Sequence, residues 1–178
     1  SKSQMDGIPP LYSLHLFASE ANIQQYKRDL IMDFSVVITT YNRPDYLEQS
    51  LKSVLAQHVQ PKEIIVIDDN STASYTDVLS KFDDVRIKYL KQPVSGGANV
   101  ARNRGVKESS GDVVAFLDDD DVWLPVYLDH HQEKYLDGAD AVVSGFRHLG
   151  HESKIRVNSD TVVSKTSLIR GNHYCGMS

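Results

Sequence analysis

The stretch that most constrains this chain is a short apolar run that ends in consecutive carboxylates. Residues 113–117, V-V-A-F-L, are apolar and strand-forming without interruption, and Asp118, Asp119, Asp120 and Asp121 follow directly. An unbroken run of this kind predicts a strand buried on both faces, as in a parallel sheet. Open α/β sheets bind ligands beyond the carboxyl ends of their strands, so the run predicts a site at its own C-terminal end.

The acidic run itself predicts a cation site. Adjacent carboxylates repel one another unless protons or a cation compensate their charge. Along an extended chain Asp118 and Asp120 would point to one side, and Asp119 and Asp121 to the other. Carboxylate oxygens suit a hard divalent ion such as Mg²⁺ or Mn²⁺. A solvated turn is the alternative interpretation, whereas an EF-hand loop is excluded because its obligatory glycine would be Trp123.

The bulk composition bounds the class of protein. The chain has 178 residues, 40% of them hydrophobic and 24% charged, which suits one α/β domain with its own core. A net charge of −5 and the lack of a basic block disfavour nucleic acid as a partner. Cys175 is the only cysteine, which excludes an internal disulfide and a thiolate metal site. No apolar run reaches the ~20 residues of a transmembrane segment and no signal peptide is visible, so we expect a cytoplasmic protein and leave peripheral membrane association open.

The N-terminal part differs from the rest of the chain. Residues 1–10 predict a flexible leader, and Ser rather than Met at position 1 suggests processing or a trimmed boundary. Ragged helical spacing predicts one helix over residues 13–30. We therefore expect an N-terminal leader and helix over residues 1–33, and a single domain over residues 34–178.

From residue 34 onward, apolar patterns predict alternating strands and helices. The predicted strands are 34–40, 64–67, 85–90, 112–118, 141–149 and 154–157, and the predicted helices are 44–57, 74–82, 97–108, 125–136 and 165–170. This order favours a mainly parallel sheet flanked by helices. The strand over 64–67 also ends in acids, Asp68 and Asp69, so these carboxylates should share an edge with Asp118. Gly96-Gly97 opens the helix over 97–108, where free backbone N–H groups favour an anion.

Four segments of the chain resemble, in order and in spacing, a known enzyme family. They are V-V-I-T-T-Y-N-R-P-D-Y-L (36–47), I-V-I-D-D-N-S (65–71), A-R-N-R-G (101–105) and G-D-V-V-A-F-L-D-D-D-D-V-W-L-P (111–125). Together they are similar to the large inverting family of GT-A glycosyltransferases that make bacterial polysaccharides, lipopolysaccharide and capsule. The resemblance covers residues 34–137 and extends more loosely to 178. It implies an α/β, Rossmann-like GT-A fold with a mainly parallel sheet flanked by helices.

The resemblance also implies a donor and a binding site for its base. The donor is a nucleotide-diphosphate sugar, a UDP- or dTDP-sugar. Thr39 and Tyr41 match positions that line the base pocket through backbone and stacking contacts. Asp69, with Asp68 beside it, matches the carboxylate that reaches the base or ribose.

The acidic run resembles the D-x-D motif of this family, which binds the diphosphate through Mg²⁺ or Mn²⁺. Asp118 and Asp120 match its two acids, with Asp118 near the ribose and Asp120 holding metal and diphosphate. The middle position is often small and polar in the family, whereas here it is Asp119, which leaves open which of the acids touch the metal. Arg102 matches a position near the diphosphate, and a surface ion pair is its alternative role.

The implied activity is transfer of the sugar, with inversion, to a saccharide or glycolipid acceptor. The attacking hydroxyl needs a base, which in this family is an acid well downstream of the D-x-D. His151 and Glu152 match no such motif, so the catalytic base stays unidentified. We expect it after Ser178, which makes this chain the donor-binding half of a truncated transferase.

Three other functions are alternatives for a chain with this pattern, and two of them are disfavoured. A non-catalytic nucleotide-sugar-binding module is the alternative from a different class. A sugar nucleotidyltransferase is disfavoured because T-T-Y-N-R-P-D, after the first strand, has no glycine-rich basic loop. A Rossmann oxidoreductase is disfavoured because no G-x-G-x-x-G follows that strand.

Overall fold

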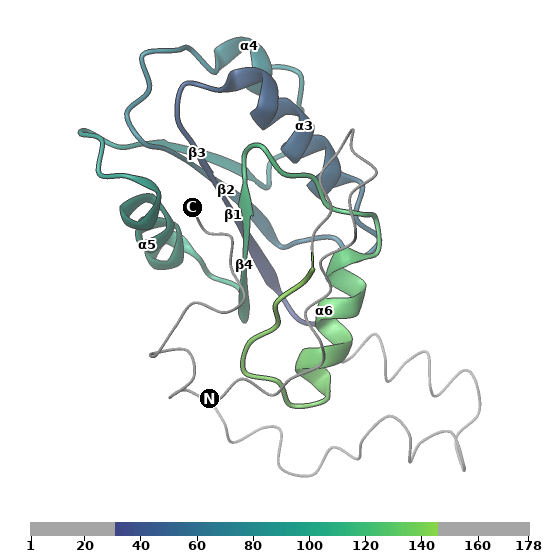
Figure 1. Ribbon diagram of the computed structural model, residues 1–178. Helices are drawn as coiled ribbons and strands as arrows, with labels where there is room; N and C mark the ends of the chain where they lie inside the picture. Colours follow the sequence, from purple (N-terminus) through teal and green to yellow (C-terminus); the bar gives the residue numbers. More distant parts are fainter. Residues whose placement is uncertain (1–30, 146–178) are drawn as a thin grey trace, which may run out of the picture. The chain divides into compact units, whose positions relative to one another are not determined.

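Strands and helices alternate along the described part of the chain, which in this computed structural model is residues 31–145. The elements are β1 (Phe34–Thr40), α3 (Pro44–Leu55), β2 (Glu63–Asp68), α4 (Thr76–Leu79), β3 (Ile87–Lys91), α5 (Ala98–Glu108), β4 (Val113–Asp118) and α6 (Tyr127–Leu136) (Figure 1). The chain divides into two compact units between Asp137 and Gly138, and all of these elements belong to the first. The helices predicted over 13–30 and 165–170 and the strand over 154–157 lie outside the described residues.

The four strands form one parallel sheet in the order β3-β2-β1-β4. The register places Val37 of β1 between Ile65 of β2 and Phe116 of β4. β1 and β2 are buried at every position, as their runs of Val and Ile predict. The predicted parallel, adjacent arrangement of these three strands is confirmed.

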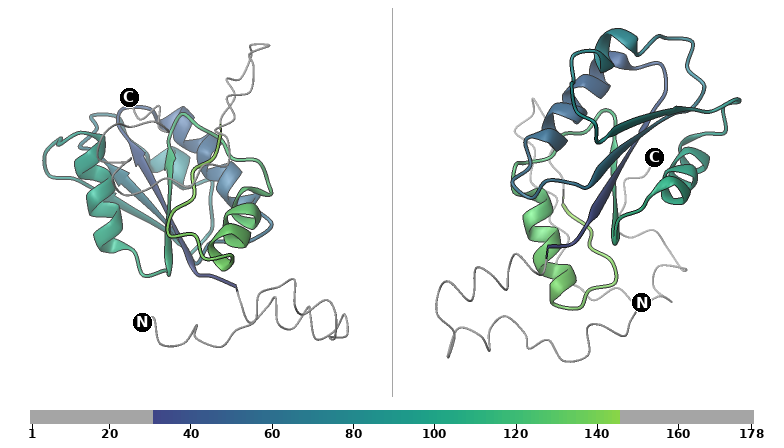
Figure 2. Two further views of the ribbon diagram at one scale, coloured as in Figure 1. Left: turned by 60° about the horizontal axis from the view of Figure 1, so that its bottom comes forward. Right: turned by 180° about the vertical axis from the view of Figure 1, so that it is seen from behind.

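Helices cover both faces of this sheet. Helix α5 lies on one face, and α3 and α6 lie on the other (Figures 1 and 2). Side chains alternate along β1, so Val36 and Ile38 join the core under α3 and α6, while Val37 packs with Ala101 of α5. Helix α3 begins with Pro44 at its first turn, which needs no backbone donor there. The predicted α/β, mainly parallel class is confirmed.

Two glycines allow close approaches that hold the fold together. A Cβ on Gly105 of α5 would lie 2.3 Å from Cγ1 of Val37, so only glycine lets α5 pack this closely on β1. A Cβ on Gly111 would lie 2.4 Å from the backbone oxygen of Asp33, next to the start of β1. Both contacts help set the position of β4, because Gly105 and Gly111 flank the connection that leads into this strand.

Three sequence-based expectations were wrong. The run over 113–117 is buried on one face only, because α5 packs on β1 and β2 and leaves Phe116 of β4 43% exposed. Residues 141–145, the described start of the strand expected over 141–149, form no strand. The third strand begins at Ile87 rather than at 85, because the backbone N–H of Ile87 closes a turn onto the oxygen of Asp84. Alternation and apolar content alone do not reveal an edge or a turn.

Within residues 31–145, no helix is long and apolar enough to cross a membrane.

Candidate functional site

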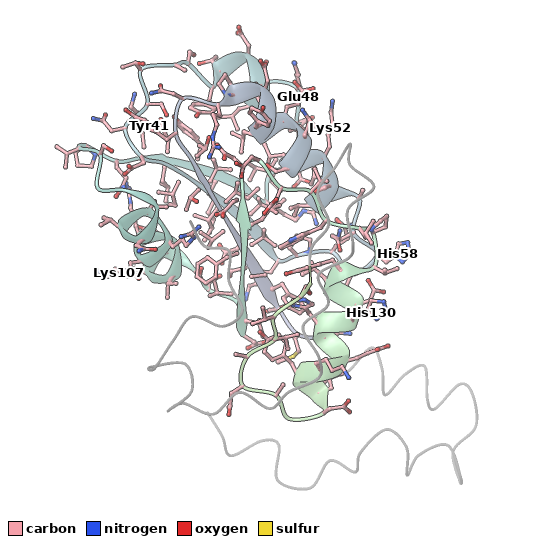
Figure 3. The ribbon with its side chains drawn as sticks, viewed as in Figure 1. Tyr41, Glu48, Lys52, His58, Lys107 and His130 are labelled. Carbon is pink, nitrogen blue, oxygen red and sulfur yellow. The ribbon has the colours of Figure 1, made fainter. Side chains whose placement is uncertain are left out.

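The carboxyl ends of β1, β2 and β4 lie next to one another at one edge of the sheet. Thr39 of β1 is paired with Asp118 of β4, and Thr40 is paired with Asp68 of β2. The predicted shared edge for Asp69 and Asp118 is therefore confirmed. Tyr41, which follows β1, also lies at this end of the sheet and is 49% exposed (Figure 3).

The acidic run forms a tight turn in which the carboxylates take different environments. Strand β4 ends at Asp118, and the backbone N–H of Asp121 closes the turn by donating to the oxygen of Asp118. The side chains of Asp118 and Asp120 are 34% and 46% exposed. Asp119 is almost fully buried, at 1% exposure. The predicted grouping of Asp119 with Asp121 on one side is wrong, because the run forms a turn rather than an extended chain and leaves Asp121 exposed like Asp120.

Asp119 is held by groups from the segment that follows β1. Oδ2 of Asp119 accepts a 2.7 Å hydrogen bond from the Thr40 hydroxyl. Nη2 of Arg43 lies 2.6 Å from Oδ1, which is an ion pair by distance without hydrogen-bond alignment. Burial raises the pKa of Asp119, and the hydrogen bond from Thr40 and the charge of Arg43 offset part of that effect.

Two arginines compensate the charge of the acidic turn. The Arg43 guanidinium bridges two carboxylates, because its Nη1 also donates to Oδ2 of Asp120 at 2.7 Å. Nη2 of Arg102, from α5, donates to Oδ1 of Asp118 at 2.6 Å. The side chain of Arg102 is only 12% exposed, so this ion pair is not a loose surface contact. Two roles were predicted for Arg102, a position near the diphosphate or a surface ion pair. The structure shows an ion pair, and its acid, Asp118, belongs to the candidate site.

Asp69 anchors the loop between β3 and α5. Its carboxylate accepts hydrogen bonds from Gln92 Nε2, Ser95 Oγ and the backbone N–H groups of Gly96 and Gly97, at 2.5–2.8 Å. Burial alone would raise the pKa of Asp69, but these hydrogen bonds hold it below its ordinary value. The anion that we expected at the start of α5 is therefore the chain's own Asp69.

Asp68 is fully buried and its bonds are internal. Its Oδ2 accepts the Tyr89 hydroxyl at 2.5 Å, and its Oδ1 accepts the backbone N–H of Ser71 at 2.8 Å. Burial, followed by the neighbouring carboxylate of Asp68, raises the pKa of Tyr89. These contacts fit a structural role for Asp68 in shaping the loop after β2.

The loops after β1 and β2 are fastened to each other by Asn42. Its Oδ1 accepts hydrogen bonds from the backbone N–H groups of Thr72 and Ala73, and its own N–H donates to Ser71 Oγ. The φ angle of Asn42 is 56°, a left-handed conformation that Asn adopts more readily than most residues. The turn that carries Tyr41 is therefore fixed from the neighbouring loop.

The acidic turn provides part of a ligand set for a divalent ion. Residues 31–145 contain no cluster of three or more His, Cys, Asp or Glu side chains arranged to hold a metal. The turn does offer carboxylates that are at least partly exposed, those of Asp118, Asp120 and Asp121, and the first two are the predicted ligands. Proteins commonly bind Mg²⁺ through one or two carboxylates together with substrate phosphates. The side chains present fit an ion that binds together with a diphosphate, and do not fit one held by protein ligands alone.

A parallel sheet in the order β3-β2-β1-β4 with helices on both faces is a Rossmann-like arrangement, and the solved structure that it matches identifies it as the GT-A type. S. aureus TarS in complex with UDP-GlcNAc matches with a TM-score of 0.53 and 31% identity, over 60% of this chain and 31% of that chain. Residues 35–174 match the model of glycosyl transferase family 2, and the chain belongs to this family.

Two curated relatives illustrate this kinship. A GalNAc(5)-diNAcBac-PP-undecaprenol beta-1,3-glucosyltransferase of Campylobacter jejuni is 41% identical over 107 residues, which cover 58% of this chain and 35% of that protein. A UDP-Glc:alpha-D-GlcNAc-diphosphoundecaprenol beta-1,3-glucosyltransferase of Escherichia coli is 39% identical over 90 residues, covering 51% of this chain and 36% of that protein. The chain thus spans little more than a third of the length of these relatives.

The structure brings the sequence-predicted residues together at one edge, and it adds others that sequence patterns did not single out. The predicted residues at this edge are Thr39, Tyr41, Asp68, Asp69, Arg102, Asp118, Asp119 and Asp120. The added residues are Thr40, Asn42, Arg43 and Tyr75. Arg43 lies in the short turn between β1 and α3 and could have been identified as a counter-charge for the acids at that edge. Tyr75 lies in a loop and carries no local signal.

Proposed function

We propose that this chain is the donor-binding part of a glycosyltransferase that takes a UDP- or dTDP-sugar and passes the sugar to a saccharide or glycolipid acceptor with inversion. The observation that carries the proposal is the convergence of three parallel strand ends on one acidic turn. Thr39, Asp69 and Asp118 come from different strands or their ends, as a site for an extended nucleotide-sugar requires. We further propose that residues 34–178 form this domain and that residues 1–33 precede it as a separate segment.

The relatives support the class of donor and acceptor. TarS has been crystallised with UDP-GlcNAc, and the E. coli relative is named for a UDP-glucose donor and a diphosphoundecaprenol-linked sugar acceptor. These are properties of those proteins. For this chain they make a uridine diphosphate sugar the first donor to test, with a lipid-linked saccharide as the first acceptor.

The residues at the edge suit distinct parts of such a donor. The exposed ring of Tyr41 is available for stacking on a base. Asp69, which anchors the β3–α5 loop, is the acid on the side of the base or ribose. Asp118 and Asp120 would hold the divalent ion, Mg²⁺ or Mn²⁺, which would supply charge neutralisation for the leaving diphosphate. Arg102, already paired with Asp118, would keep a positive charge near the diphosphate.

Transfer also requires a base for the acceptor hydroxyl. The resemblance places that base downstream of the acidic turn, and His151 and Glu152 lie outside the described residues. A non-catalytic nucleotide-sugar-binding module is therefore the second candidate function. It has the same donor-side residues and differs only in lacking turnover.

Calorimetry and a transfer assay on the whole chain test the proposal. We expect UDP-GlcNAc or UDP-glucose to bind, and Mn²⁺ to strengthen that binding. Acceptor-dependent release of UDP in addition to binding would establish the transferase, whereas binding without turnover would establish the module. A chain that binds no uridine or thymidine diphosphate sugar, with or without metal, would contradict both.

A further inference from the structure

A buried tyrosine hydroxyl links three segments around the acidic turn. Tyr75, just before α4, is 2% exposed, and its Oη lies 2.8 Å from the Thr40 hydroxyl. The same Oη accepts the backbone N–H of Arg43 at 3.1 Å and lies 3.3 Å from the hydroxyl of Ser71. Thr40 in turn donates to Asp119, so Tyr75 is one hydroxyl removed from the turn.

The chemistry of Asp119 sets the direction of every hydrogen bond in this chain of hydroxyls. An ionised carboxylate only accepts, so the single hydroxyl proton of Thr40 goes to Asp119. Tyr75 must then donate its own proton to Thr40, and Ser71 must donate to Tyr75. Ser71 Oγ is left to accept the backbone N–H of Asn42, which it does at 2.8 Å. All protons point toward Asp119, and bonds aligned in this way strengthen one another.

We propose that Tyr75 is a positioning residue: its hydroxyl orients Thr40, and through Thr40 it holds the buried Asp119, so that Asp118 and Asp120 face the diphosphate. The role toward the diphosphate rests on the proposed function. Asp119 is the one acid of the turn that is buried, so its position decides how its neighbours on either side project. The contact with Ser71 extends this control to the loop after β2, which carries Asp69.

A matched set of variants separates positioning from general stability. Tyr75→Phe removes the hydroxyl and keeps the ring, which packs in the core beside Tyr89. Thr40→Val removes the next hydroxyl, and Thr40→Ser restores it. Tyr89→Phe is the control, because it also deletes a tyrosine hydroxyl in the same core, but that hydroxyl donates to Asp68 and is not linked to Thr40.

Hydrogen exchange provides a readout that needs no ligand. The backbone N–H of Tyr41 belongs to the residue that follows Thr40, that of Asp121 donates to the oxygen of Asp118, and neither bonds to Tyr75. We expect exchange at both amides to be roughly tenfold faster in Tyr75→Phe and Thr40→Val, and unchanged in Thr40→Ser and Tyr89→Phe.

Nucleotide binding provides the second readout, as the ratio of UDP affinity with Mn²⁺ to that without it. Loss of an outer-shell partner typically reduces metal affinity roughly 10- to 100-fold. We expect this ratio to fall about tenfold in Tyr75→Phe and Thr40→Val, with metal-free UDP affinity retained. Thr40→Ser and Tyr89→Phe should keep the ratio.

The outcomes are distinct. Wild-type exchange at Tyr41 and Asp121 in Tyr75→Phe would overturn the proposal, and so would an unchanged metal ratio. Equal losses in Tyr75→Phe and Tyr89→Phe would show general destabilisation and would also overturn it. If the wild-type chain shows no metal-dependent UDP binding, the proposed function fails, and the exchange measurement alone then decides whether Tyr75 positions the turn.

Discussion

At the residue scale, charge compensation explains how four adjacent acids coexist in one turn. Arg43 contacts Asp119 and Asp120 and Arg102 contacts Asp118, so three of the four acids each have a guanidinium beside them. A partly exposed carboxylate can exchange its arginine for another cation at modest cost, because water screens the pair. The buried Asp119 cannot do so without exposing an uncompensated charge. Aspartate therefore serves as a buried anchor at position 119 and as a candidate metal ligand at positions 118 and 120.

This difference predicts opposite effects for two conservative substitutions. Asp120→Asn should leave thermal stability unchanged, because its side chain is 46% exposed, yet reduce Mn²⁺-dependent UDP binding by about tenfold or more. Asp119→Asn should lower the free energy of unfolding by about 1–3 kcal/mol, because the buried ion pair with Arg43 loses its anion.

Thermal denaturation and calorimetry on both variants check this prediction. A stable Asp120→Asn variant that keeps full metal-dependent affinity would remove Asp120 from the candidate ligands. An Asp119→Asn variant as stable as the parent chain would show that its burial has little energetic consequence.

At the element scale, the position of α5 depends on one glycine. Gly105 lets the helix rest directly on Val37 of β1, and α5 carries both Arg102 and the loop that Asp69 anchors. The packing of this helix therefore sets two polar contacts of the candidate site at once.

We expect Gly105→Ala to lower the free energy of unfolding by about 1–3 kcal/mol through overpacking. The added Cβ would lie 2.3 Å from Val37 Cγ1, and a β-branched side chain has little rotamer freedom with which to yield. The gain of about 1 kcal/mol in helix propensity from Gly to Ala works against this cost.

Chemical denaturation of a double-mutant cycle with Val37→Ala isolates the contact. In the Val37→Ala background the added methyl group has space, so Gly105→Ala should there be neutral or stabilising. Equal costs in both backgrounds would mean that the close approach of α5 and β1 is not what selects glycine.

At the scale of the whole domain, polar networks join the strands at both ends of the sheet, the amino ends and the carboxyl ends. The edge opposite the candidate site is organised by Glu63, whose carboxylate accepts bonds from Ser35 of β1, Lys88 of β3 and Ser110 before β4, at 2.6–2.8 Å. One side chain thus connects three strands and the segment that leads into the fourth. Burial would raise the pKa of Glu63, but Lys88 and the two serines together lower it from 4.5 to about 2.

This shift predicts how the domain responds to acid. Because the folded pKa lies below the unfolded value, the stabilisation by Glu63 is complete above pH 4.5 and is lost as the pH falls toward 2. In that window Glu63 alone should steepen the fall in the free energy of unfolding by up to about 1.4 kcal/mol per pH unit. Glu63→Gln should lower stability at neutral pH and flatten this slope.

Denaturant titrations between pH 2 and 7 measure the effect. Glu108→Gln is a control on the surface of α5, where Glu108 is 48% exposed and lies 4.0 Å from Nε of Arg104. Exposed pairs contribute little, so this variant should follow the parent curve closely. An unchanged acid slope in Glu63→Gln would contradict the role of Glu63 in joining the strands.

The strands and their parallel arrangement followed from the sequence, because buried Val and Ile runs and amphipathic helices are local patterns. The same reasoning put Asp69 and Asp118 at one edge, since parallel strands share their carboxyl side. Local patterns failed where contacts with other segments decide whether a side chain is buried. The apolar run of β4 did not reveal that Phe116 would be exposed, because exposure depends on which strands and helices lie beside it.

The amino-acid sequence by itself determined the order of the elements, the edge at which the polar residues collect and the family to which these motifs belong. Only the tertiary structure decided which acid is buried and what holds it. Asp119 turns inward to Thr40, a residue 79 positions earlier in the chain, and Tyr75 supports that contact from a third segment. Such pairings form because burying the whole sheet brings distant loops together and leaves each buried polar group to find a partner. No pattern within a single segment encodes that choice.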